Sequence, residues 1–159
     1  MKTILSIFIL ALVLSSCKKE KSNESVFDVG VDITVKSKDG KDLLNPSTQN
    51  AYLAQNIKIF YLINGVKEEV FYENYDHPRN FMIYEKDGVY RMGLTLNYSS
   101  TEAYPITYVQ WSENNTDTLK TEIFRESGIE SCKDIWLNNN LVWKNEDYEK
   151  GERKIEIIK

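Results

Sequence analysis

IKIFYLINGVKEEVFY, residues 57–72, is the stretch that decides the fold. Two alternating runs flank Asn64-Gly65, a pair that suits a two-residue type I′ turn because both central positions need a positive φ. That turn places Ile59 opposite Val70, so that one face of the hairpin is almost entirely apolar. The stretch therefore predicts two antiparallel strands that bury one side.

The neighbouring segments repeat this pattern. Residues 29–35, VGVDITV, alternate apolar and polar side chains, as expected of a strand with one buried face. A second two-residue turn at Asp87-Gly88 places Ile83 opposite Met92, and Leu96 continues the apolar face. Gly93 lies on the opposite face, where a bulge or a close approach of another side chain is expected.

The rest of the chain supplies further short strands. We expect them at residues 102–112, 118–125, 131–137, 141–144 and 153–158, with residues 41–56 as a long connection. No window of helical length carries an apolar stripe. Roughly nine short strands separated by turns predict an all-β fold, an antiparallel β-sandwich that is immunoglobulin-like or related. A closed antiparallel β-barrel is the alternative.

Charge and cysteine content narrow the classes of function. The 159 residues carry a net charge of −4, with both signs mixed along the chain, which argues against a nucleic-acid surface. The two cysteines are Cys17 and Cys132. If Cys17 is modified, Cys132 has no intrachain partner, and we expect it to be a small buried strand residue.

The first seventeen residues have the pattern of an export signal. Lys2 provides a positive start, residues 4–14 are apolar, and Leu14-Ser15-Ser16-Cys17 ends the run with small residues before a cysteine. An apolar run of this length is too short to span a bilayer, which takes about 20 residues. Any stable attachment to a membrane must therefore come from a lipid.

Leu14-Ser15-Ser16-Cys17 resembles the lipobox of bacterial lipoproteins. The resemblance implies that residues 1–16 are a signal peptide and that Cys17 carries diacylglycerol and palmitate. It also implies a flexible tether over residues 17–25 and a single β-sandwich domain over residues 26–159. The membrane, reached through lipidated Cys17, is then the first expected partner.

Together with the tether and the strand-rich body, residues 39–46, DGKDLLNP, resemble small, uncharacterised β-rich envelope lipoproteins of Bacteroidota. That resemblance implies a place in the cell envelope, at the outer membrane. Surface-exported lipoproteins of that phylum tend to carry acidic residues directly after the cysteine. Here Lys18 and Lys19 precede Glu20, so the periplasmic and the surface face both stay open.

The sequence offers little for catalysis. His77 is the only histidine, and no Gly-x-Ser-x-Gly elbow supplies a nucleophile. One histidine and one free cysteine do not make a zinc site. The acidic loop at residues 145–149 matches no calcium-loop spacing. We therefore expect no catalytic residue, no metal and no cofactor.

Aromatic content is the remaining unusual feature. On the expected strand near residue 106, Tyr104 and Tyr108 fall on one face and Trp111 on the other, while Trp136 and Trp143 flank residues 138–140. These five are the candidate ligand-binding residues, because exposed aromatic rings can stack on sugars or bind a protein. The alternative is that they are core anchors and cross-strand partners.

The expected function is a non-catalytic binding or interaction module for a protein or a glycan. A structural or accessory subunit of an envelope complex is the alternative, and an enzyme is the least favoured class. A compact patch of exposed aromatic residues with polar neighbours would favour glycan binding. A long uncovered edge strand would favour assembly, and a pocket converging on His77 would favour catalysis.

Overall fold

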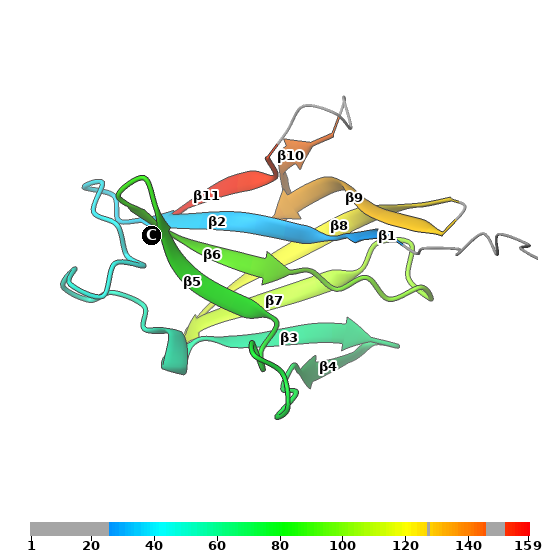
Figure 1. The fold of residues 1–159 in the computed structure, drawn as a ribbon, viewed down its shortest axis with the longest axis horizontal. Coiled ribbons are helices and arrows are strands. Elements are labelled where there is room, and N and C mark those ends of the chain that lie inside the picture. Colours follow the sequence, from blue (N-terminus) through cyan, green and yellow to red (C-terminus); the bar gives the residue numbers. More distant parts are fainter. Residues whose placement is uncertain (1–25, 127, 146–151) are drawn as a thin grey trace, which may run out of the picture.

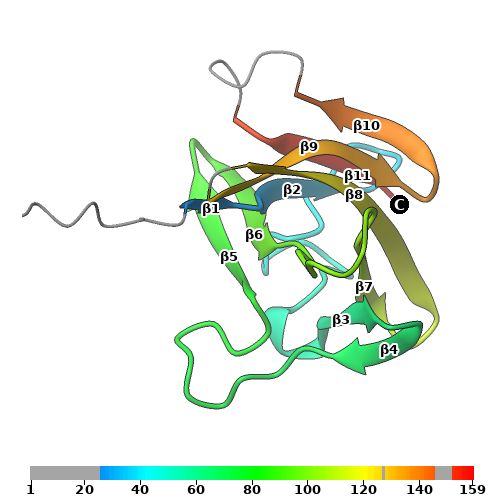
Figure 2. The same ribbon diagram turned by 90° about the vertical axis from the view of Figure 1, so that its right-hand side faces the viewer.

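The computed structural model describes residues 26–126, 128–145 and 152–159. Two β-sheets face each other across one core, and the larger sheet curls around the smaller (Figures 1 and 2). The prediction of an all-β sandwich is confirmed, and the two separate sheets exclude the closed-barrel alternative for this part of the chain. Residues 1–25, for which a signal peptide, a lipidated Cys17 and a tether are predicted, lie outside the described residues.

The larger sheet has the strand order β1-β9-β8-β7-β3-β4, and β10 also pairs with β9. Its strands are β1 (Val26–Asp28), β3 (Lys58–Ile63), β4 (Val66–Glu69), β7 (Ile106–Ser112), β8 (Asn115–Glu126), β9 (Ile129–Leu137) and β10 (Asn140–Lys144). The smaller sheet has the order β11-β2-β6-β5. Its strands are β2 (Gly30–Lys36), β5 (Phe81–Lys86), β6 (Val89–Thr95) and β11 (Lys154–Ile158).

Both predicted hairpin registers are confirmed. Strands β3 and β4 pair around Asn64-Gly65, and the Val70 amide donates to the Ile59 carbonyl at 2.9 Å. Strands β5 and β6 pair around Asp87-Gly88 with Ile83 opposite Met92. All four turn residues have positive φ, as a type I′ turn requires.

Two pairings differ from a purely antiparallel sandwich. Strand β1 runs parallel to β9, and β11 runs parallel to β2. Only Val29 separates β1 from β2, so the chain passes from the larger sheet to the smaller one at this buried residue. Parallel pairs join strands that are distant in sequence, and strand periodicity alone does not reveal them.

Several strand boundaries also differ from the predictions. Strand β7 begins only at Ile106, because Pro105 has no amide to give to a ladder. Strand β8 begins at Asn115 and is longer than predicted. Its polar start, Asn115 to Asp117, was not recognised as strand. The long connection contains one 3-10 turn, Ala54–Asn56.

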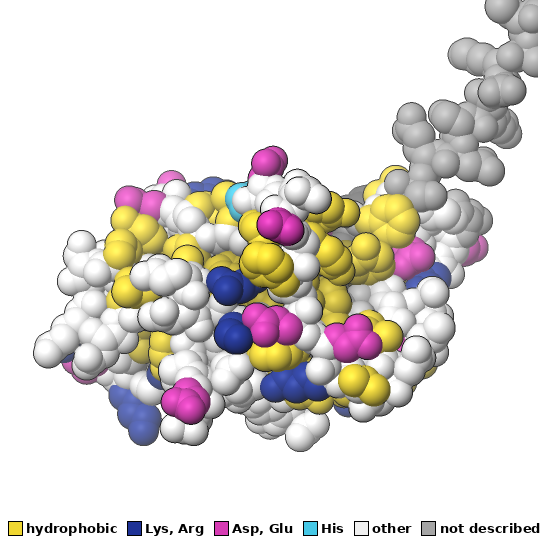
Figure 3. All heavy atoms as spheres, turned by 90° about the horizontal axis from the view of Figure 1, so that it is seen from below, with side chains coloured by type: hydrophobic (Ala, Val, Ile, Leu, Met, Phe, Trp, Pro, Cys, Tyr) yellow, Lys and Arg dark blue, Asp and Glu magenta, His cyan; other side chains and the backbone are white. Residues whose placement is uncertain are grey.

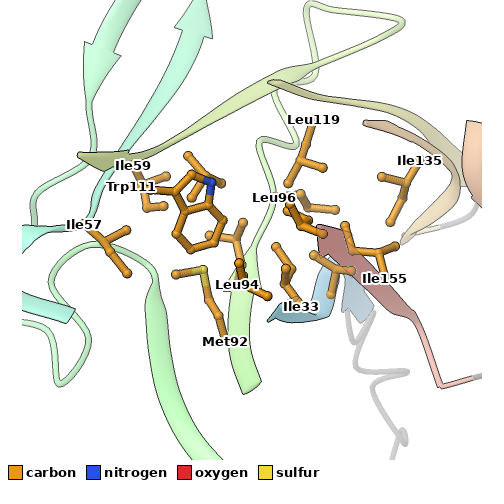
Figure 4. Packing of buried hydrophobic residues seen from close by; sticks show 14 of the residues in the cluster. Ile33, Ile57, Ile59, Met92, Leu94, Leu96, Trp111, Leu119, Ile135 and Ile155 are labelled. Carbon is orange, nitrogen blue, oxygen red and sulfur yellow. The ribbon is translucent and has the colours of Figure 1, made fainter. Parts of the chain in front are cut away.

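The core lies between the two sheets (Figure 4). Ile33, Met92 and Leu94 come from the smaller sheet and meet Ile59 and Trp111 of the larger one. Each of these side chains is nearly or completely buried, and burying a side chain of this kind contributes about 1.5–3 kcal/mol. Cys132 is also fully buried, as predicted, and burial raises the pKa of its thiol to about 12.

One end of the sandwich is closed by a polar cluster around Trp111. The indole Nε1 of Trp111 donates to Asp117 Oδ2 at 2.7 Å, and Lys159 Nζ lies 2.6 Å from the same oxygen. Asn138 Nδ2 donates to the other oxygen of Asp117 at 2.8 Å. We call this region, with Tyr52 packed on the Trp111 ring, the closed end.

Candidate functional site: a tyrosine groove

The structure does not gather the five aromatic candidates into one site. Trp111 is 1% exposed and belongs to the core, so its ring is not available to a ligand. Tyr104 and Tyr108 lie on the outer side of the larger sheet, as the predicted faces require. Trp136 lies on that outer side too, next to Lys120 of the neighbouring strand.

Trp136 and Trp143 do not face each other across their hairpin. The turn is Asn138-Asn139, where both residues have positive φ, and an irregularity follows between Leu141 and Trp143. Trp136 therefore pairs with Leu141, and Trp143 pairs with Ile135. Trp143 packs against the core while the Arg153 guanidinium covers its ring at 5.0 Å.

Cations already cover the rings on the outer side of the larger sheet. Lys120 Nζ lies 4.6 Å from the centre of the Trp136 ring and 5.7 Å from that of Tyr104. Lys67 Nζ lies 4.7 Å from the centre of the Tyr108 ring. Such cation–π contacts contribute about 0.5–1 kcal/mol at exposed sites, and a ligand stacking there would have to displace them.

Two adjoining hollows lie at the other end of the sandwich, where β3 ends at Ile63 and β6 ends at Thr95. Their volumes are about 550 Å³ and 890 Å³, within the range of about 300–1,000 Å³ common for ligand sites. Tyr75, Asn80 and Thr95 line both. None of the five predicted aromatic residues lines either hollow.

The smaller hollow, which we call the tyrosine groove, is lined by four tyrosines that are far apart in sequence. They are Tyr61, Tyr72, Tyr75 and Tyr98. Tyr72 and Tyr75 stack on each other in the β4–β5 loop with ring centres 5.1 Å apart. The Tyr75 amide donates to the Tyr72 carbonyl, and the Tyr72 amide donates to the Pro78 carbonyl, so the loop folds back on itself.

Tyr98 forms the opposite wall, on the loop between β6 and β7. Its ring packs on Phe27 of β1 with centres 5.9 Å apart. Arg125 Nη2 donates to the carbonyls of Tyr98 and Ser99, at 3.3 and 2.8 Å. The wall is therefore fixed from two sides, while 41% of Tyr98 stays exposed.

The floor of the groove is polar and internally bonded. The Tyr61 hydroxyl donates to the Thr95 carbonyl at 2.7 Å and accepts from Asn80 Nδ2 at 3.1 Å. Burial raises the pKa of this phenol, the hydrogen bond from Asn80 lowers it, and the phenols of Tyr72 and Tyr98 raise it further.

One carboxylate faces the tyrosine groove. Glu130 lines it, and its Oε2 atom lies 3.5 Å from Arg125 Nε. That oxygen is buried and accepts no hydrogen bond from the described residues. No Lys, Arg or His belongs to the described lining of this groove. Because Arg125 pairs with Glu130, the tyrosine groove is polar with little net charge.

The larger hollow, which we call the acidic hollow, carries His77. Figure 3 shows a face with one histidine, in cyan, on which hydrophobic, acidic and basic side chains are interspersed. Asp32, Asp76 and Glu152 line the hollow, with Asp28 beside Arg153. Hydrogen bonds from Arg153 at 2.8 and 3.0 Å hold the pKa of Asp28 below its usual value, although burial opposes this.

The described residues contain no group of three or more His, Cys, Asp or Glu side chains placed to hold a metal ion. The acidic loop at residues 145–149 lies almost entirely outside the described part of the chain. Within residues 26–126, 128–145 and 152–159, no helix has the length and hydropathy needed to cross a bilayer.

Sequence reasoning missed the tyrosine groove because its four tyrosines come from one strand and two loops. Tyr72 was expected at the end of the first hairpin, but β4 ends at Glu69, so Tyr72 and Tyr75 both lie in the β4–β5 loop. Tyr61 looked like any inward residue of β3, and Tyr98 stood in a connection. Their meeting depends on how the two sheets stack, which period-two patterns do not specify.

Comparison with known proteins gives no relative for this chain. No family model matches the sequence, and no curated protein and no solved structure matches it either.

Proposed function

We propose that this protein is a lipid-anchored, non-catalytic binding module of the bacterial envelope that takes its ligand in the tyrosine groove. The tyrosine groove is the observation that carries the proposal. Tyr72, Tyr75 and Tyr98 are 44%, 63% and 41% exposed, and their hydroxyls make no hydrogen bond to other described residues. Apolar rings with free polar tips at a hollow are well suited to recognition.

The anchor is proposed from the lipobox at residues 14–17. Two acyl chains on Cys17 would hold the protein stably at a membrane, and we place it at the outer membrane, on either face. Nine residues, 17–25, separate that lipid from Val26, and a chain of this length reaches at most about 30 Å. Phe27 touches Tyr98, so the anchor would keep the tyrosine groove near the membrane.

Edge strands argue for a groove-binding module over a subunit that assembles by strand addition. The outer strands of both sheets are only three to six residues long. Charged residues occupy several of them, such as Lys67 and Glu68 on β4 and Lys154 and Glu156 on β11. Short, charged edges discourage the pairing of a further strand.

The acidic hollow is the place where an enzyme could be sought, since His77 lines it. Its described lining includes neither Ser nor Cys, the nucleophiles that a histidine most commonly activates. Cys132 does not serve either, because burial raises the pKa of its thiol to about 12. These observations support a non-catalytic role.

Site-specific cross-linking in living cells tests this proposal. We would place a photoactivatable amino acid at Tyr75, which lines both hollows, and at Tyr104 as an exposed control outside them. We expect a covalent adduct from position 75 that weakens when Tyr98→Ala is added. Position 104 should give no such adduct.

The anchor is tested in the same cells by labelling with radioactive palmitate. The unchanged chain should take up the label and sediment with membranes, and Cys17→Ala should do neither. Equal labelling of both forms would refute the anchor. An absence of any adduct at position 75, with the protein folded and present, would refute the binding role.

A further inference from the structure

We propose that the tyrosine groove and the acidic hollow together bind a neutral oligosaccharide. This inference rests on the proposed binding function and names the class of its ligand. Three observations carry it: the exposed tyrosine faces, the polar groups between them, and the electrostatic character of both hollows.

The first observation is the combination of flat rings and hydrogen-bonding groups. A pyranose ring has one face of C–H groups and a rim of hydroxyls, so it needs an aromatic platform and polar partners beside it. Tyr72 and Tyr98 provide platforms on opposite walls. Their hydroxyls, which make no hydrogen bond to other described residues, supply polar partners.

The second observation is the lack of aliphatic side chains in the tyrosine groove. Ile63 is the only aliphatic residue in its described lining. Peptides that bind in grooves are usually held by apolar pockets for alternate side chains or by main-chain pairing to a sheet edge. The groove offers neither, whereas amide, hydroxyl and carboxylate groups are plentiful there. The lining of the tyrosine groove is therefore better suited to a sugar than to a peptide.

The third observation is charge. Glu130 is the only charged residue in the described lining of the tyrosine groove. In the acidic hollow, Arg153 pairs with Asp28, and Lys86 and Lys154 pair with Glu152. Asp32 and Asp76 have no such ion pair among the described residues, so the hollow keeps an acidic character. Carboxylates accept hydrogen bonds from sugar hydroxyls but repel a negative ligand. Uronic acids and sulfated sugars are therefore disfavoured, and neutral sugars fit.

The shared lining sets the length of the ligand. Because Tyr75, Asn80 and Thr95 belong to both hollows, a bound chain passes over Tyr75 from one into the other. A single sugar ring would contact only one hollow. Affinity should therefore rise with the number of sugar units until both hollows are filled.

The test is calorimetric titration of the full chain, purified from membranes in mild detergent. The probes are one- to six-unit oligosaccharides of glucose, mannose, galactose and xylose, and six-unit chains of galacturonic acid. We expect one or more neutral series to bind, with affinity rising from one unit to four, and no binding of the galacturonic acid chain.

Variants locate the binding. Tyr72→Ala and Tyr98→Ala should each weaken it roughly threefold to tenfold, as loss of an aromatic contact does. Tyr98→Phe should retain most of the affinity, because it keeps the ring, and Tyr104→Ala should retain all of it. Circular dichroism confirms that each variant is folded.

Three outcomes would overturn the inference: no binding of any neutral oligosaccharide at millimolar concentration, equal binding of the galacturonic acid chain, or equal losses in Tyr98→Ala and Tyr104→Ala. The cross-linker at Tyr75 separates this failure from that of the proposed function. A protein adduct without sugar binding overturns the oligosaccharide and leaves the binding module intact. Neither adduct nor sugar binding overturns both.

Discussion

At the closed end, the indole of Trp111 is buried and its N–H donates to Asp117. At the groove end, Tyr72, Tyr75 and Tyr98 keep exposed rings, and their hydroxyls bond to no other described residue. Both ends use aromatic residues next to a carboxylate. The closed end pairs its polar side chains with one another, whereas at the groove end only the floor around Tyr61 is paired and the three exposed phenols are not paired with other described residues. The comparison separates aromatic residues that build the fold from those available to a ligand.

The largest effect should follow from removing the Trp111 ring. Trp111→Ala leaves a cavity between the sheets and removes a hydrogen bond from Asp117, so we expect the free energy of unfolding to fall by about 3–5 kcal/mol. Trp136→Ala, on the outer side of the larger sheet, should cost about 1 kcal/mol. Urea titration measures both, and equal losses would contradict the assignment.

The next effect concerns the charge of Asp117. Burial raises the pKa of this carboxyl, but hydrogen bonds from Lys159, Asn138 and Trp111 outweigh burial, so the pKa is lower in the folded protein. The ionised carboxylate therefore stabilises the fold fully above the unfolded pKa of about 3.9, and this stabilisation is lost as the pH falls through the folded pKa.

Asp117→Asn removes the titrating group and should flatten the loss of stability below about pH 4. Thermal unfolding midpoints from pH 7 to pH 3 measure this slope for both proteins. Identical slopes would show that the cluster at the closed end does not depend on the charge of Asp117.

At the groove end, a substitution should reduce ligand binding while changing stability little. Tyr98→Ala removes a partly exposed ring that touches Phe27, so we expect a loss of stability below about 1 kcal/mol. Ligand binding should nevertheless fall, as described above. Urea titration measures the free energy of unfolding of this variant beside that of Trp111→Ala. Equal losses in the two variants would contradict the proposed difference between the two ends.

The smallest effect is expected between the ends, at Cys132. Its thiol is buried and its pKa is raised to about 12, so very little thiolate forms at neutral pH. In the Cys17→Ala form, iodoacetamide at pH 8 should leave Cys132 unmodified until urea unfolds the chain. Mass spectrometry follows the reaction, and rapid alkylation of the folded protein would contradict this placement.

The local part of the fold was predictable from the sequence. Asn64-Gly65 and Asp87-Gly88 specify their turns through backbone sterics, and each turn sets the register of its hairpin. The buried alternation of Val31, Ile33 and Val35 was predictable for the same reason, because a strand has a period of two. These features depend only on residues close together in the chain.

The features that were not predicted depend on contacts between residues distant in sequence, or on turns that the local sequence allows equally. The sequence Asn138-Asn139-Asn140 allows two turns, and the structure uses the first pair, which separates Trp136 from Trp143. Tyr108 and Trp111 occupy opposite faces of β7, but only the stacking of the sheets decides which face is the core. The tyrosine groove depends on that same stacking.

The parallel pairing of β11 with β2 has a consequence for how the domain folds. The Thr34 hydroxyl donates to the Ile155 carbonyl, 121 residues away, so the smaller sheet joins the first part of the domain to the last. Such distant pairings make folding slow, on the scale of milliseconds to seconds. The smaller sheet cannot be completed during synthesis until β11 has left the ribosome, and a chain destined for export would meet the translocation machinery before its sandwich has closed.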